Sequence, residues 1–215
     1  MTKKQRAAKM IELLKEEYPQ VKCALTYEKP HELLIATRLS AQCTDKRVNM
    51  VTPALFERFP TVEAFAEAEV PEIEEYIKSC GLYHTKASDI SMMCRELRER
   101  FGGVVPDTIE ELITLPGVGR KTANLIVGDL YGKPALVCDT HVIRLTNLIG
   151  LTDTKDAVRV EKQLAAVVPP EEGLNMCHRL VWHGRLVCIA RRPQCDKCRI
   201  REICRFATKK VNNEQ

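Results

Sequence analysis

The chain has 215 residues, of which 45% are hydrophobic and only 5% are aromatic. A core built mainly from Leu, Ile, Val and Ala suits packed helices and argues against a β-sandwich, whose strands favour aromatic and β-branched residues. The net charge of +4 permits a polyanionic partner without requiring one, and no apolar run reaches the roughly 18 residues of a membrane span.

Apolar residues at three- and four-residue spacing predict helices along most of the chain. The first pattern runs from Ala7 to Tyr18 and stops at Pro19. A second covers residues 44–59, where the internal Pro53 predicts a kink or a break.

Two further helices are indicated by the residues at their ends. Pro71 fits the first turn of a short helix, and Gly81 fits the cap that closes it. Residues 87–101 then repeat the helical spacing, and Gly102 with Gly103 ends it.

The second half of the chain continues this pattern. Asp107, followed three residues later by Glu110, predicts a capping pair that opens a helix. Residues 164–168 carry an apolar stripe predicted to end at Pro169. Only residues 135–137 suggest a strand, and they are too few to build a sheet, so the predicted fold class is all-α.

The segment Leu115–Ala123 joins two predicted helices. Gly117 and Gly119 permit backbone conformations that other residues avoid, which predicts a tight hairpin between the helices. The free N–H groups of such a hairpin and the positive end of the second helix form a site for an anion, such as a DNA phosphate. Gly117, Val118, Gly119 and Arg120 are therefore candidate DNA-binding residues.

Lys121 lies on the first turn of the second helix and has two interpretations. In isolation it is a lysine that contacts a phosphate or faces solvent. The alternative is an amine nucleophile, because the helix N-terminus and Arg120 both disfavour a charged ammonium and burial would add to this. A neutral amine can attack a sugar carbon and form a Schiff base.

Asp139 lies in the sequence Cys138-Asp139-Thr140-His141, directly before an apolar run. An aspartate at this position is a good helix N-cap. A cap leaves one carboxylate oxygen free, so Asp139 could also take up the proton of the amine or stabilise positive charge on a sugar. His141 is interpreted as a polar residue beside the pocket and not as a catalytic group.

Ten cysteines are present, and four of them cluster near the C-terminus. Cys188, Cys195, Cys198 and Cys204 are separated by six, two and five residues. Residues 1–10 lack the apolar stretch of a signal peptide, so we expect a cytoplasmic chain whose clustered thiols bind metal. The spacing allows zinc or iron–sulfur. Because zinc ribbons pair two CxxC knuckles and only one is present, a [4Fe–4S] cluster is favoured.

These segments together resemble the endonuclease III branch of the helix-hairpin-helix DNA glycosylases. The matching stretches, in order, are Leu39-Ser40-Ala41-Gln42, Gly81-Leu82-Tyr83, Leu115 to Asn124, Asp139-Thr140-His141, and His183-Gly184-Arg185 leading into the cysteine loop. The resemblance implies a six-helix barrel over residues 23–133, interlocked with an iron–sulfur cluster domain formed by residues 1–22 and 134–215. It also implies that DNA lies in the cleft between the two domains.

The resemblance implies a reaction as well. An oxidised pyrimidine is flipped out of the duplex, and Lys121 attacks C1′ and displaces the base. The resulting imine permits β-elimination, which nicks the strand on the 3′ side, while Asp139 handles protons. Gln42 and Leu82 match the positions that plug and wedge the emptied base stack. Arg191, in the cysteine loop, either offsets the charge of the cluster or faces a DNA phosphate.

The implied partner is double-stranded DNA that contains damaged pyrimidines or abasic sites. The cluster is expected to be structural, and the protein is expected to be a bacterial-type monomer associated with the nucleoid in the cytoplasm, without a membrane partner. Cys43 and Cys138 stand where relatives often carry small or apolar residues, and neither replaces a catalytic group.

Three alternatives compete with this interpretation. An adenine-removing mismatch glycosylase would lack a lysine at position 121 and carry an extra C-terminal domain. A thymine-mismatch glycosylase on the same scaffold would differ in the shape of its base pocket. A non-catalytic DNA-binding or electron-transfer module would need the hairpin and the cysteines but not both Lys121 and Asp139.

Overall fold

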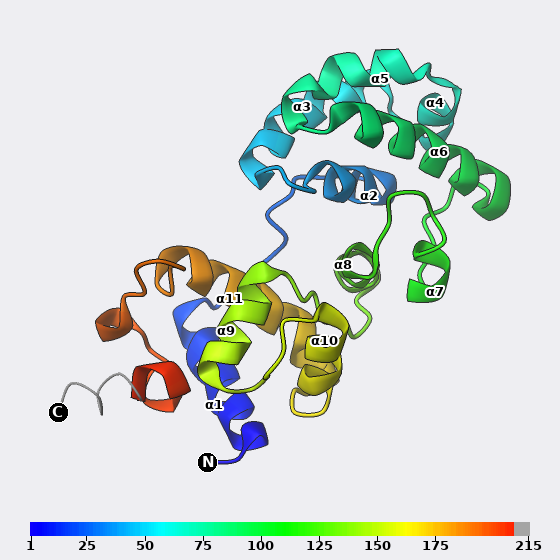
Figure 1. The fold of residues 1–215 in the computed structure, drawn as a ribbon. Coiled ribbons are helices and arrows are strands. Elements are labelled where there is room, and N and C mark those ends of the chain that lie inside the picture. The colour runs from blue at the N-terminus through cyan, green and yellow to red at the C-terminus, as the bar shows by residue number, and fades with distance from the viewer. Residues whose placement is uncertain (209–215) are drawn as a thin grey trace. The chain divides into compact units, whose positions relative to one another are not determined.

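The computed structural model describes residues 1–208 and divides the chain into two units. The central unit is Cys23–Tyr131, and the terminal unit combines Met1–Lys22 with the chain from Gly132 onward. Both are built from helices (Figure 1), and residues 1–208 contain no strand, which confirms the all-α prediction. The roles predicted for the barrel and cluster domains stay predictions, and residues 209–215 of the latter lie outside the described residues.

Helix α2 (Pro30–Leu39) forms the centre of the central unit. Leu33, Leu34 and Ile35 have no exposed surface although they are consecutive, so α2 is enclosed on several sides. The surrounding elements are α3 (Asp45–Arg58), α4 (Val62–Glu67), α5 (Val70–Ile77), η1 (Lys78–Cys80), α6 (Tyr83–Phe101), α7 (Ile109–Leu112) and α8 (Arg120–Tyr131). The longest of them, α6, packs against α4 and α5.

The terminal unit packs helices from both ends of the chain. Helix α11 (Gly173–Leu186) contacts α1 (Lys3–Glu17) and α9 (Thr140–Ile149). The remaining elements are α10 (Ala157–Ala165), η2 (Pro170–Glu172), η3 (Cys195–Lys197) and η4 (Arg201–Ile203). The two short 3₁₀ helices η3 and η4 carry the cysteine loop, so this loop is attached to a unit that the first helix helps to build.

Several predicted helix ends are confirmed. Helix α1 ends before Pro19, and α6 ends at Phe101 with Gly102 in the left-handed conformation at φ 59°. Pro71 lies in the first turn of α5 as expected. Gly81, however, follows the 3₁₀ turn η1 and not α5 itself, because the chain tightens into η1 before it leaves the helix.

The predicted cap of α7 is wrong by one residue. Thr108, not Asp107, is the N-cap, and its hydroxyl accepts a hydrogen bond from the Glu111 N–H at 3.3 Å. The Thr108 hydroxyl also donates to the Glu111 carboxylate at 2.7 Å. Threonine and aspartate are both good N-caps, so the sequence did not distinguish the two neighbouring positions. The glutamate that completes the cap is Glu111 and not the predicted Glu110.

Two other expectations about helices are also addressed by the structure. Helix α3 runs through Pro53 without a break, so of the two predicted outcomes only the kink stays a prediction. Helix α10 ends at Ala165 and not at Pro169, although Val168 is buried as the stripe indicated. An apolar side chain can be buried without being helical, and Val168 packs against the core from a turn. The apolar periodicity therefore predicted a helix that was too long.

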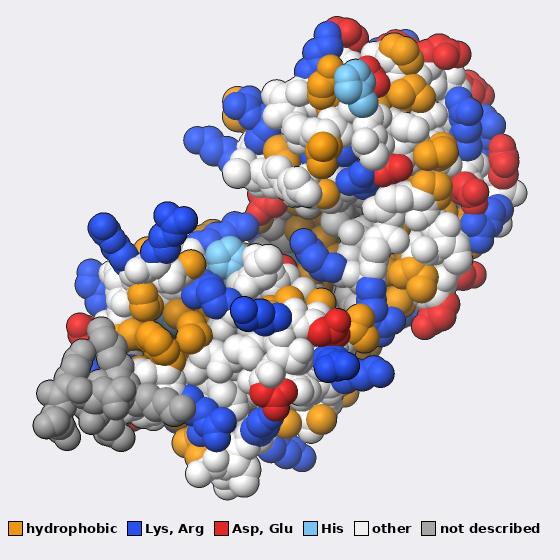
Figure 2. All heavy atoms as spheres, viewed as in Figure 1, with side chains coloured by type: hydrophobic (Ala, Val, Ile, Leu, Met, Phe, Trp, Pro, Cys, Tyr) orange, Lys and Arg blue, Asp and Glu red, His pale blue; other side chains and the backbone are white. Residues whose placement is uncertain are grey.

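The surface carries both signs of charge. Figure 2 shows lysine and arginine side chains gathered over the end of α11 in the terminal unit. Arg185, Arg191 and Arg192 are exposed in this part of the chain. None of the helices within residues 1–208 combines the length and the apolar character needed to cross a membrane.

Candidate functional site

The hairpin before α8 is formed by a tight turn. The Val118 N–H donates to the Leu115 carbonyl at 3.1 Å, which closes the turn Leu115-Pro116-Gly117-Val118. Proline at the second position and a glycine with φ 72° at the third are the features of a type II turn. Val118 is buried, so its side chain fixes the hairpin to the core of the central unit.

Gly117 is required for a second reason. A Cβ atom there would lie 2.7 Å from Arg38 Nε and 2.9 Å from Asp89 Oδ2. These two side chains form a half-buried ion pair, in which Arg38 Nε donates to Asp89 Oδ2 at 2.7 Å. The pair lies against the hairpin and was not identified from the sequence, because its members are 51 residues apart.

Gly119 differs from Gly117, and here the sequence prediction needs correction. Its φ is not in the left-handed region, and a Cβ atom would meet nothing within 4 Å. Neither the conformation nor the packing of the described protein therefore requires glycine at position 119. Its backbone remains open to close approach by a ligand.

Lys121 follows on the first turn of α8, as predicted, and is exposed. Arg120 beside it is also exposed. The first N–H groups of an α-helix have no partner within the helix and carry the positive end of its dipole. A lysine amine and a ready anion site thus lie within one helical turn of each other in the central unit.

Asp139 is the N-cap of α9, as the sequence predicted. Its Oδ1 accepts the Val142 N–H at 2.8 Å, which leaves the second carboxylate oxygen available. Burial raises the pKa of the adjacent Cys138 thiol to about 12, so Cys138 remains protonated and unreactive. Asp139 belongs to the terminal unit and Lys121 to the central unit.

His141 is the second residue of α9 and is partly buried. A Cβ atom on Gly184 of α11 would lie 2.6 Å from its Nδ1, so the imidazole packs directly on that glycine. Burial, Arg144 and Arg185 lower the pKa of His141, and Asp139 opposes this. The ring is therefore held in its neutral form.

Gln42 and Leu82 share an uncommon backbone conformation. They are the only non-glycine residues with positive φ within residues 1–208, at 53° and 50°. Both are exposed, and Leu82 exposes 59% of its surface, which rules out an ordinary core leucine. Left-handed backbone costs a non-glycine residue about 1–2 kcal/mol, so the surrounding structure must impose it.

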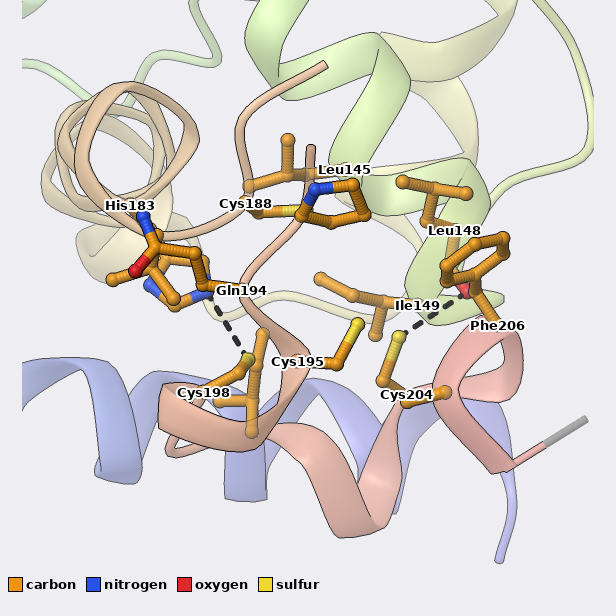
Figure 3. Close-up of a pocket in the computed structure, with 14 residues that line it drawn as sticks. Leu145, Leu148, Ile149, His183, Cys188, Gln194, Cys195, Cys198, Cys204 and Phe206 are labelled. Atoms are coloured by element: carbon orange, nitrogen blue, oxygen red, sulfur yellow. Dashed lines mark hydrogen bonds between the residues drawn. The ribbon is translucent and has the colours of Figure 1, made fainter. Parts of the chain in front are cut away.

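The four cysteines of the C-terminal loop line one apolar pocket in the terminal unit (Figure 3). The pocket encloses about 400 Å³, counting the open space at its mouth. Cys188 Sγ lies 3.6 Å from Arg144 Nη1, and Cys198 Sγ lies 3.3 Å from His183 Nε2. Burial raises the pKa of Cys188, and it raises that of Cys198 to about 11.

The thiols do not converge on one point. Within residues 1–208, no group of three or more His, Cys, Asp or Glu side chains is placed to hold a single metal ion. Arg144 and His183 contact two of the cysteines but were not assigned a role from the sequence. Arg191, which was predicted to bind DNA, is exposed in the loop.

Comparisons with known proteins give a consistent result. Residues 35–170 match the model of the HhH-GPD superfamily of base excision DNA repair proteins. The chain is similar to Endonuclease III of Synechocystis sp., with 47% identity over 204 residues, which cover 94% of this chain and 93% of the relative. It is 41% identical over 205 residues to Endonuclease III of Escherichia coli K12, covering 94% of this chain and 97% of the relative.

A solved structure of a trapped endonuclease III–DNA covalent intermediate is also similar. It superposes with a TM-score of 0.92 at 40% sequence identity and covers 98% of this chain and 100% of the other. This likeness extends over both units of the chain.

Proposed function

Because this chain belongs to the endonuclease III family within the HhH-GPD superfamily of base excision DNA repair proteins, we propose that it is a DNA glycosylase with abasic-site lyase activity, acting on oxidised pyrimidines. The observation that carries the proposal is an exposed lysine, Lys121, directly after the glycine hairpin on the first turn of α8. A protein that only binds DNA has no need for an amine nucleophile there.

The reaction assigns a step to each residue. The Lys121 amine attacks C1′ of the flipped nucleotide, the C1′–N bond breaks, and the base leaves with a proton. The sugar ring opens to an imine between C1′ and Lys121. Loss of a proton from C2′ then expels the 3′ phosphate and nicks the strand. Asp139 accepts protons and stabilises the positive charge with the oxygen that does not cap α9.

The hairpin binds the DNA backbone in this proposal. Gly117 shapes the turn, and Gly119 lets a phosphate approach the N–H groups at the start of α8. Such contacts position the duplex without reading its sequence. Arg120 and His141 contact the backbone beside the flipped nucleotide, and Arg191 contacts a phosphate near the cysteine loop.

Gln42 and Leu82 act on the base stack. The Gln42 amide hydrogen-bonds the orphaned base, and the Leu82 side chain enters between neighbouring bases. Their exposure and strained backbone support this, because an apolar side chain held in solvent gains contacts when it enters DNA. Flipping is easiest where damage has already weakened pairing.

Cys188, Cys195, Cys198 and Cys204 would hold a [4Fe–4S] cluster. A tetrahedral zinc site would bring its sulfurs within about 3.8 Å of one another, given Zn–S bonds near 2.3 Å. The four thiols line one pocket, and within residues 1–208 they form no group that could hold a single ion, which suits a multi-iron cluster better than one zinc ion. When bound, the cluster would fix the shape of the loop. Purified protein should therefore be brown with stoichiometric iron, whereas colourless protein with zinc would contradict the assignment.

The remaining proposals concern state and location. We propose that the chain acts as a monomer on double-stranded DNA containing damaged pyrimidines or abasic sites, in the bacterial cytoplasm at the nucleoid. Light scattering of the free protein and of its complex with a short duplex tests whether the protein is a monomer in both states.

Borohydride trapping tests the catalytic assignment. On a duplex with one thymine glycol, borohydride reduces the imine to a stable protein–DNA adduct that peptide mapping should place at Lys121. Lys121→Ala should bind the duplex but give neither adduct nor nick. The matched control is Lys29→Ala, which removes an exposed lysine of the same unit and should trap normally. Cleavage by Lys121→Ala at the wild-type rate would refute the nucleophile.

A further inference from the structure

Lys86 is the one lysine among residues 1–208 with no exposed surface. It lies in the first turn of α6, and long cationic side chains are almost never enclosed in this way unless paired. The titratable groups that act on it are the thiols of Cys43 and Cys80 and the guanidinium of Arg38. Burial lowers its pKa, and no carboxylate is among the groups that oppose this. A specific set of hydrogen bonds must therefore compensate for its burial.

These hydrogen bonds go to two backbone carbonyls. Lys86 Nζ donates to the carbonyl of Leu39 at 2.8 Å and to the carbonyl of Cys80 at 2.5 Å. Leu39 is the last residue of α2, and Cys80 is the last residue of η1. The final carbonyls of a helix have no partner within it and carry its negative end, so an ammonium is well suited to both.

Each of these two helix ends leads directly into a segment that contains one of the two strained residues. Gln42 follows Leu39 by three residues, in a turn closed by the Cys43 N–H and the Ser40 carbonyl. Leu82 follows Cys80 by two residues. A single buried ammonium thus holds both segments that carry left-handed, exposed, non-glycine residues, although they are 40 positions apart in the chain.

We propose that Lys86 is a positioning residue for nucleotide flipping, which keeps residues 40–43 and 81–82 in register so that Gln42 and Leu82 enter the duplex together. The proposal rests on the glycosylase function above. It assigns no chemistry to Lys86, which contacts neither substrate nor the reacting atoms. Without Lys86 the two segments would still exist, but each could relax from its strained conformation independently.

The effect should depend on the substrate. A damaged base must be unstacked and unpaired before excision, whereas an abasic nucleotide has no base to remove and is easily extruded. Lys86→Met keeps the length of the side chain and removes both hydrogen bonds. We expect single-turnover excision of thymine glycol to fall by about 10- to 100-fold, as small misplacements commonly do, and trapping at a preformed abasic site to fall by less than about threefold.

The experiment measures both rates and a spectroscopic signal. A 2-aminopurine placed opposite the lesion brightens when its stacking is broken, so wild type should raise the fluorescence and Lys86→Met should not. The matched control, Lys29→Met, removes a lysine that donates to the Pro60 carbonyl elsewhere in the same unit and should behave as wild type. Lys86→Gln, which keeps shorter donors, replaces Lys86→Met if the latter does not fold.

The outcomes separate the two proposals. An equal fall on both substrates, or a wild-type fluorescence rise in the folded Lys86 variant, would overturn the positioning role while the glycosylase function stands. If wild type itself neither excises the lesion nor traps on the abasic site, the glycosylase function fails, and the role of Lys86 in flipping fails with it.

Discussion

At the scale of single residues, Asp139 combines two roles that a substitution can separate. Its carboxylate caps α9 and is also the proposed proton acceptor. Asp139→Asn keeps a capping oxygen but cannot take up a proton, so base excision should be lost while the thermal midpoint changes little. Asp139→Ala should lose activity and also about 1 kcal/mol of unfolding free energy. Activity retained in Asp139→Asn would show that the carboxylate serves only as a cap.

His31 predicts a dependence of stability on pH. It is 8% exposed on α2, its Nε2 has no hydrogen-bond partner within the described chain, and burial lowers its pKa below the ordinary 6.5. Lys29 lowers it further, while Glu32 and Glu63 raise it. The unfolded chain therefore binds a proton that the folded chain resists, so the His31 contribution is lost as pH falls below 6.5.

Urea unfolding at several pH values measures this contribution. Between pH 7.5 and 5.5 wild type should lose stability, and His31→Leu should lose less over the same interval. Equal slopes in the two proteins would show that the imidazole finds a partner or solvent when it is charged.

At the scale of elements, the two glycines of the hairpin have different roles. The fold requires Gly117, whereas Gly119 is expected to be required only for DNA binding. Gly117→Ala forces a left-handed alanine and places its Cβ against Arg38 and Asp89, so the unfolding free energy should fall by at least about 1–2 kcal/mol. Gly119→Ala meets open space and should fold as wild type, but its methyl group should obstruct a phosphate and weaken DNA binding. Chemical denaturation and binding isotherms of both variants test the distinction, which would collapse if the Gly119 variant bound normally.

The elements also show how far sequence patterns extend. Helices α1, α6 and α9 were predicted because apolar spacing agrees with a residue at one end of each helix, namely Pro19 after α1, Gly102 after α6 and Asp139 before α9. The cap at Thr108 was missed because two adjacent residues cap equally well, and α10 was drawn too long because a turn residue is also buried. In each case the local sequence is compatible with two positions for the end of the helix, and tertiary packing determines which of them forms.

The candidate site also combines features that the sequence predicts with features that it does not. Lys121, Asp139 and the four cysteines are identified by motif and spacing, with their catalytic and metal-binding roles still to be tested. The Arg38–Asp89 pair behind the hairpin and the bond from Lys86 to the Leu39 carbonyl could not be predicted, because both join positions more than 45 residues apart by contacts with no local pattern. Supporting interactions of this kind become visible only once the chain is folded.

At the scale of the whole molecule, Arg6 is one of the residues that hold the first helix to the second half of the chain in the terminal unit. Arg6 on α1 donates to the Ile149 carbonyl at 2.8 Å and to the Ile203 carbonyl at 3.0 Å. It thereby joins the first helix to the end of α9 and to η4. The central unit is consequently an insertion between two segments of the terminal unit, which composition along the chain did not indicate.

The net charge of +4 is small for a protein proposed to bind DNA, so affinity must come from a few placed cations. Each phosphate neutralised adds about −0.9 to the slope of log affinity against log salt.

Arg120→Ala and Arg191→Ala should each reduce the magnitude of that slope by about one and weaken binding to damaged and undamaged duplexes alike. Arg98→Ala is the matched control, because Glu67 and Glu99 already pair with this partly exposed arginine, and its slope should equal that of wild type. Binding measured at several salt concentrations decides the matter. An unchanged slope in Arg191→Ala would assign that arginine to the charge of the cluster rather than to DNA, because a cation that neutralises no phosphate releases no counterion.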